Sequence, residues 1–143
     1  MSFASQPTEE IRQGDTVLAV IIRASFDEPG VHFFSEDHYS QQLGVINYPS
    51  GHKIVPHVHN RVPREVMYTQ ETLFIRSGRL RVDFYRDDRT YLDSRELGAG
   101  DVLLLSTGGH GFEVLEDCSM VEVKQGPYAG EGDKTRFEPA SRP

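Results

Sequence analysis

The chain has 143 residues, a single cysteine, and 22 acidic against 15 basic residues, which give a net charge of −7. A chain of this length forms one domain around a single core, and its negative charge repels a phosphate backbone, so we expect no nucleic-acid partner. One cysteine provides neither a disulfide framework nor a cysteine-rich zinc site within the chain, and it favours a reducing compartment.

The N-terminal segment, residues 1–30, is expected to contribute a strand that packs on the main domain. Its first ten residues, MSFASQPTEE, have neither the basic region nor the apolar core of a secretion signal. The aliphatic run VLAVII at 17–22 is typical of a strand and is far too short to span a bilayer. We therefore expect a cytoplasmic protein with no membrane partner.

Residues 31–125 predict the core of the domain, because their apolar residues recur with a period of two. The segment RLRVDFYR places Leu80, Val82 and Phe84 on one face, as in a half-buried strand. Other strand-like runs, separated by turn sequences, lie at 43–48, 53–59, 71–76, 90–97, 101–106, 111–116 and 119–125. Short antiparallel strands at this spacing predict an all-β sandwich or small barrel, and no long stretch is typical of a helix.

The C-terminal segment, residues 126–143, is rich in glycine, proline and charge. It predicts a surface tail, in which Tyr128 and Phe137 are the residues suited to dock against the barrel. Cys118 follows the sequence LED and is expected in a turn.

Two histidines, His57 and His59, lie one residue apart in the predicted strand 53–59. Side chains at positions i and i+2 of a strand point to the same face, so both rings would project together at a spacing that suits one divalent ion. The competing interpretation is a solvated strand face that carries two histidines.

The histidine pair belongs to a longer pattern: Gly51, five residues, His57, one residue, His59, and later Glu71, six residues and Gly78. This pattern resembles the first motif of the cupin superfamily, in which a glycine, two histidines, a glutamate and a closing glycine supply three metal ligands inside a β-barrel. The resemblance therefore implies that both histidines and the glutamate bind a metal.

The interval before the glutamate differs from the family pattern, because eleven residues separate His59 from Glu71 where the family has three or four. Glu65, which lies in this longer interval, is the competing carboxylate. Glu71 is the better match, since it opens the strand-like run ETLFIRSG and has the expected spacing to the closing glycine.

The segment GDVLLLSTGGHGF at 100–112 resembles the second cupin motif, which implies His110 as a fourth ligand. It differs from that motif in two respects: Ser106 stands where the family has proline, and the interval to His110 is one residue shorter. The alternative for His110 is a turn histidine between two glycines.

Together with SGRLRVDFYRDD, LGAGDVLLL and VEVKQGPYAG, the long interval is similar to that of the small bacterial WbuC-like cupin fold metalloproteins, over about residues 44–137. The resemblance implies a single-domain jelly-roll barrel, also described as a double-stranded β-helix, and a link to polysaccharide metabolism. It also implies a homodimer, since small cupins often dimerise through their outer strands.

Imidazole and carboxylate ligands suit one divalent transition metal, and they do not choose among Fe, Mn, Ni and Zn. Such a metal can polarise a carbonyl, acidify a water or activate dioxygen. We therefore expect a metal-dependent enzyme of the isomerase, epimerase or dioxygenase type that acts on a small polar, sugar-derived substrate. The alternative is a non-catalytic ligand-binding or sensory module.

Four further residues are candidates for the lining of this site. Tyr68 and Lys53 are candidate acid/base groups, since Lys53 is in phase with His57 and Tyr68 lies on the approach to Glu71. Arg64 and Gln70 are candidate substrate-binding residues, in the inserted loop and just before Glu71. Arginine and lysine at strand edges also serve simply to block edge pairing, and tyrosine is commonly half-buried.

Overall fold

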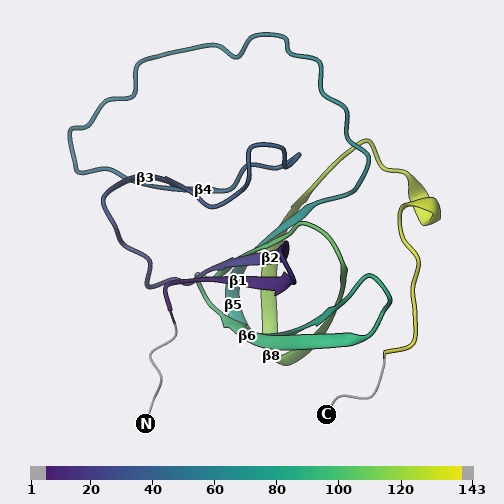
Figure 1. The fold of residues 1–143 in the computed structure, drawn as a ribbon. Coiled ribbons are helices and arrows are strands. Elements are labelled where there is room, and N and C mark those ends of the chain that lie inside the picture. The colour runs from purple at the N-terminus through teal and green to yellow at the C-terminus, as the bar shows by residue number, and fades with distance from the viewer. Residues whose placement is uncertain (1–5, 140–143) are drawn as a thin grey trace.

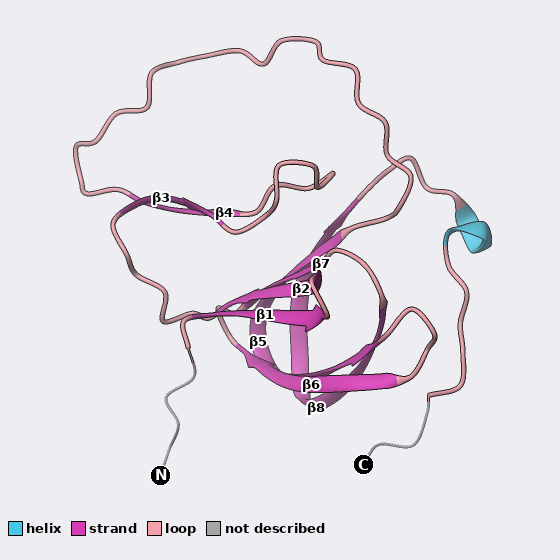
Figure 2. Ribbon diagram, in the orientation of Figure 1, coloured by secondary structure: helices cyan, strands magenta, loops and turns pink. Residues whose placement is uncertain are grey.

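A computed structural model describes residues 6–139 of the chain, and it confirms an all-β architecture. Figures 1 and 2 show one curled sheet and a separate two-stranded hairpin. The curled sheet contains β1 (Thr8–Gln13), β2 (Thr16–Ile22), β5 (Glu71–Tyr85), β6 (Tyr91–Gly98), β7 (Val102–Leu105) and β8 (Gly109–Lys124). The hairpin pairs β3 (Gly30–Phe33) with β4 (Gly44–Asn47).

The strand order of the curled sheet is β1-β2-β7-β5-β6, and every pairing is antiparallel. β5 pairs with β7 through its first residues, with β6 through its second half, and with β8 from end to end. The sheet curls around its own apolar face into a half-barrel (Figure 1). The architecture agrees with the expected barrel at this coarser level.

The core lies on the concave side of the half-barrel, where inward-facing aliphatic side chains from β1, β2, β5, β6 and β7 pack together. β2 is buried from Val17 to Ile22, so this part of the N-terminal segment is an inner strand of the sheet. β7 is apolar on both faces, as predicted, because Leu103 and Leu105 enter this core while Leu104 packs under Phe34 on the convex side.

The two longest strands differ from the prediction, since each joins two runs that the sequence appeared to separate by a turn. The sequences RSGR and LEDC lie opposite each other and form bulges between β5 and β8. Gly78, with φ of 84°, sits in this bulge, where a Cβ would lie 2.0 Å from the Asp117 carbonyl oxygen. The expectation that Cys118 lies in a turn is wrong, because it is half-buried within β8 against the core.

The predicted strand at 53–59 is also wrong. The arm, which we define as residues 48–68, contains no strand, and every residue in it is exposed. Figure 1 shows the arm sweeping in a wide arc away from the sheet before the chain enters β5. An extended segment needs a hydrogen-bonded neighbour to become a strand, and this segment has none within residues 6–139.

A buried carboxylate, that of Asp101, holds together the loops that follow β2 and β6. Asp101 accepts hydrogen bonds from the backbone N–H groups of Ala24 at 2.9 Å and Gly98 at 2.8 Å, and from Arg23 Nη1 at 3.1 Å. It therefore joins the connections that follow β2 and β6 to the start of β7.

The C-terminal tail runs past β8 to the 3-10 helix η1 (Gly130–Asp133) and then returns to the barrel. Phe137 packs edge-on against Tyr85 with 5.2 Å between ring centroids, so it docks the tail as the sequence suggested. Tyr128 remains 81% exposed. Among the described residues no helix has the length and apolar character required to cross a membrane.

Candidate functional site

The centre of the candidate site is a contact between two residues that the sequence singled out, Glu71 and His110. His110 Nε2 lies 3.1 Å from Glu71 Oε2, and both side chains are partly buried. The strand pairing explains this contact, because Glu71 is opposite Leu105 at the end of β7, and only a tight turn separates Leu105 from His110 at the start of β8. Ser106 fixes that turn, since its hydroxyl donates to the Val17 carbonyl at 2.7 Å.

A second carboxyl group, that of Glu122 on β8, lies beside Glu71. The pKa of Glu71 falls to about 2, mainly because the His110 ring donates to its carboxylate; burial opposes this shift, and the hydrogen bond with Glu122 reinforces it. The pKa of Glu122 is raised by its hydrogen bond to Glu71 and by burial. Glu71 is therefore the stronger acid of the two, so it is ionised at neutral pH and accepts the hydrogen bond from the His110 ring.

Sequence reasoning did not select Glu122, although a signal was present. Glu122 pairs with Leu73 in the β5–β8 ladder, so it lies on the inner face of the barrel with the buried residues of β5. In the segment VEVKQG, strand alternation places Glu122 and Lys124 on one face. Two charged residues in the inward phase of a long strand are typical of a polar site inside a barrel.

A cavity of about 740 Å³ opens in front of the Glu71–His110 pair. The sheet forms one wall through β5 and the start of β8, and the tail forms the other through residues 133–137. Its lining includes four cationic side chains, which are Arg86, Arg89, Lys134 and Arg136. Its size and its mixed polar lining suit a small polar molecule rather than a polymer.

His57 and His59 lie in the arm, outside this lining. Their ring centroids are 5.3 Å apart, so the two rings do project together as the i and i+2 spacing predicted. His57 Nδ1 lies 2.9 Å from the Val55 carbonyl oxygen, so this nitrogen makes a hydrogen bond with the nearby backbone.

The predicted four-ligand metal site is not assembled in the single chain. Within residues 6–139, no three side chains of histidine, cysteine, aspartate or glutamate are arranged to hold a metal ion. One histidine pair lies on the arm, while Glu71 and His110 use their facing atoms to bond each other. The donor types fit a divalent metal, but the arrangement within one chain does not.

The other predicted site residues have different environments. Lys53, Arg64 and the competing carboxylate Glu65 are exposed on the arm, whereas Tyr68 lines the cavity near Glu71. Gln70 is buried and structural, since its side-chain oxygen accepts from Ser40 Oγ at 3.1 Å and from the Gln41 N–H at 3.0 Å. The structure thus places Tyr68 beside the Glu71–His110 pair and leaves Lys53 and Arg64 outside the cavity lining.

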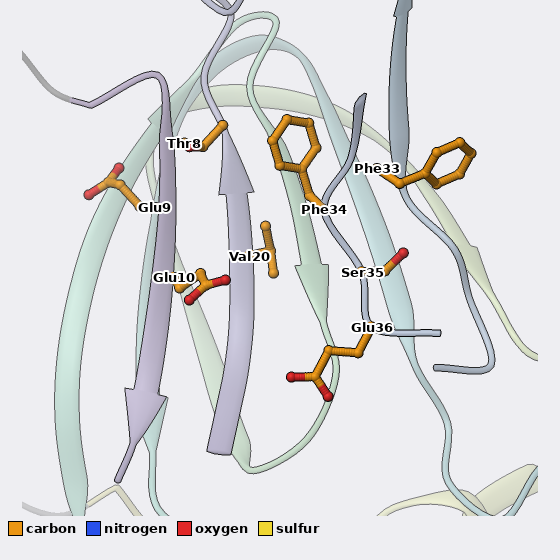
Figure 3. Close-up of a pocket in the computed structure, with 8 residues that line it drawn as sticks. All are labelled: Thr8, Glu9, Glu10, Val20, Phe33, Phe34, Ser35 and Glu36. Carbon is orange, nitrogen blue, oxygen red and sulfur yellow. The ribbon is translucent and has the colours of Figure 1, made fainter. Parts of the chain in front are cut away.

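A second hollow, of about 540 Å³, lies on the convex side between the first two strands and residues 33–36 (Figure 3). Figure 3 shows Phe33 pointing away from β1 and β2, and its side chain is 60% exposed. The acidic residues here are partly neutralised, since Glu9 bonds both Arg23 and Arg95. This hollow contains no histidine, so the Glu71–His110 cavity is the stronger candidate for acid–base chemistry.

No family model, curated protein or solved structure matches the chain.

Proposed function

We propose that the protein is an isomerase- or epimerase-type enzyme that acts on a small polar, sugar-derived substrate in the cavity beside Glu71 and His110. The observation that carries this proposal is the 3.1 Å contact between His110 Nε2 and Glu71 Oε2 at the wall of that cavity. A histidine oriented by a carboxylate is a common device for moving protons in enzymes.

The contact assigns different roles to the two residues. Because Nε2 donates its proton to Glu71, a neutral His110 carries its lone pair on Nδ1, for which residues 6–139 provide no hydrogen-bond partner. Nδ1 is therefore the proton acceptor. Glu71, with a pKa of about 2, is a weak base and acts as a positioning residue that holds the ring.

The proposed reaction balances without an oxidant or a reductant. His110 Nδ1 takes a proton from the carbon next to a carbonyl, and the electron pair of the broken C–H bond forms an enediolate. For isomerisation, the hydroxyl hydrogen moves to the former carbonyl oxygen and the proton returns to the neighbouring carbon. For epimerisation, a second group such as Tyr68, which also lines the cavity, delivers a proton to the opposite face of the same carbon. The cavity lining contains four cationic side chains, which can stabilise the negative charge of the enediolate, and four carboxylates, those of Glu71, Asp83, Asp87 and Asp133.

The metal-dependent form of this chemistry, which the cupin resemblance implies, is part of the proposal. A divalent metal would polarise the substrate carbonyl. His57 and His59 would have to join Glu71 and His110 to hold it, which requires the arm to change its position.

Solvent exchange tests the proposed proton transfer directly. In D2O, a panel of small hydroxy-ketones, aldoses and sugar acids is incubated with the protein, and deuterium at the carbon beside the carbonyl is measured by NMR. We expect His110→Gln to slow exchange at least about a hundredfold, the usual contribution of a general base. Glu71→Gln should shift the pH profile of exchange, and Glu65→Gln, on the exposed arm, is the matched control.

Two outcomes would contradict the proposal that the protein is an isomerase- or epimerase-type enzyme. One is an exchange rate that His110→Gln leaves unchanged. The other is binding of a panel compound without any exchange, which would support the ligand-binding alternative.

A further inference from the structure

The carboxylates that line the Glu71–His110 cavity are mostly bound within the protein. Three of the four accept hydrogen bonds from side chains, namely Glu71 from His110, Asp83 from Arg81 and Asp133 from Thr69. Asp87 is the exception, since within residues 6–139 its carboxylate has no such donor. Most of the negative charge in the lining is therefore already paired or hydrogen-bonded.

The four cations of the lining divide differently. Two of them donate to acceptors in the protein, Arg86 to the Tyr91 carbonyl at 2.7 Å and Arg136 to the Glu131 carboxylate at 3.0 Å. Within residues 6–139, the Arg89 guanidinium and the Lys134 ammonium make neither a hydrogen bond nor an ion pair. Two cations and the single carboxylate of Asp87 are thus left to interact with a ligand, and this balance favours an anion.

Arg89 is held at the cavity in an unusual conformation. It lies in the turn between β5 and β6, and within residues 6–139 it is the only residue other than glycine with a positive φ, of 71°. Such a conformation disfavours a side chain and is often found where a residue has a functional role. Arg89 Cζ lies 5.7 Å from the centroid of the Phe137 ring, which holds the guanidinium against the tail. A stacked arginine keeps its N–H groups available for a planar oxyanion.

Lys134 brings the second cation towards the Glu71–His110 pair. It lies on the tail wall of the cavity. The pKa of Glu122, which is raised mainly by its hydrogen bond to Glu71, is lowered by the positive charge of Lys134. The ammonium group is therefore within electrostatic range of the carboxyl pair, although it forms no hydrogen bond or ion pair with either member.

We propose that Arg89 and Lys134 form a subsite for an oxyanion, a phosphate or a carboxylate, so that the ligand of this cavity is an anionic sugar derivative rather than a neutral sugar. The guanidinium binds two oxygens of the anion side by side, and the ammonium adds a point charge. A cavity of about 740 Å³ has room for the anionic group as well as the reacting carbon. The position of the reacting carbon at His110 rests on the proposed function, whereas the subsite itself does not.

Three hexoses test the subsite by binding alone. Glucose, glucuronate and glucose 6-phosphate differ in the group at carbon 6, which is neutral, a carboxylate or a phosphate. Isothermal titration calorimetry should show that at least one anionic hexose binds about tenfold more tightly than glucose, the usual effect of a hydrogen bond to a charged group. The tighter of the two identifies the oxyanion. Because Arg89 and Lys134 are exposed, added sodium chloride should reduce this preference.

Substitutions locate the preference. Arg89→Gln/Lys134→Gln should remove most of it and leave the affinity for glucose unchanged. Arg61→Gln/Arg76→Gln, at two exposed positions outside the cavity lining, removes the same charge and should keep the preference, so it is the matched control. Lys134→Gln alone breaks no hydrogen bond within residues 6–139, and it keeps the test valid if Arg89→Gln loosens the tail.

Equal affinities for the three hexoses, or a preference that survives in both glutamine variants of the subsite, would overturn the proposal. If no hexose binds, the ³¹P NMR signal of inorganic phosphate decides. Broadening by wild type that Arg89→Gln/Lys134→Gln removes supports the subsite, and any other result overturns it.

The outcomes also separate this inference from the proposed function. Tight binding of an anionic hexose without deuterium exchange in D2O would leave the subsite standing and contradict the isomerase. Exchange of neutral compounds that an anionic group does not bind more tightly would do the reverse.

Discussion

At the scale of single residues, buried charge is used for two purposes in this barrel. Glu71 orients a histidine at the cavity wall, whereas Asp101 joins loops and lies outside the lining of that cavity. Both carboxylates are held by several donors, but only Glu71 has a partner that can exchange protons with a bound molecule. A carboxylate thus orients a histidine in one position and anchors loops in the other.

Asp101→Ala should lower the free energy of unfolding by about 3 kcal/mol, because two backbone N–H groups lose their acceptor and Arg23 loses one of its two carboxylate partners. Urea denaturation monitored by circular dichroism measures this change. Asp37→Ala, at an exposed position, should change stability by less than about 0.5 kcal/mol. An equal change in the free energy of unfolding for the two substitutions would contradict the anchoring role of Asp101.

At the scale of elements, the bulge between β5 and β8 decides the shape of the sheet. Gly78→Ala should destabilise the protein by about 2–4 kcal/mol, because its Cβ meets the Asp117 backbone and its φ of 84° disfavours any side chain. Gly132→Ala, with open space around its Cβ, is the matched control. Thermal melts measure the midpoints of both variants and of wild type. A Gly78→Ala midpoint equal to that of wild type would contradict the role of Gly78 in the bulge.

Alternation predicted the strands whose partners follow soon in the sequence, such as the run 79–86 and its neighbour at 90–97. It failed for the arm because an isolated extended segment is stabilised only by a neighbour, and composition does not say where that neighbour is. Glu71 and His110 were both identifiable from their motifs, and the structure does bring them together. Glu122 was missed because its role depends on the register between β5 and β8, which the bulges change.

At the scale of the whole molecule, the homodimer expected from the sequence would couple stability to protein concentration. A tenfold rise in protein concentration adds about 1.4 kcal/mol per dimer, which raises the thermal midpoint by about 2 °C for a chain of this length. Differential scanning calorimetry across three decades of concentration measures this dependence. A constant midpoint across this range would argue against the homodimer.

The bend in β5 and β8 sets the position of the strand end that carries Glu71. Gly78 lies about seven residues from Glu71, which is about 23 Å of strand, so a change of one degree in the bend moves that end by about 0.4 Å. Hydrogen bonds lengthen out of their useful range within a few tenths of an ångström. The distance between Glu71 and His110 therefore depends on the bend at Gly78, and substitutions around Gly78 should change that distance without altering a residue that lines the cavity.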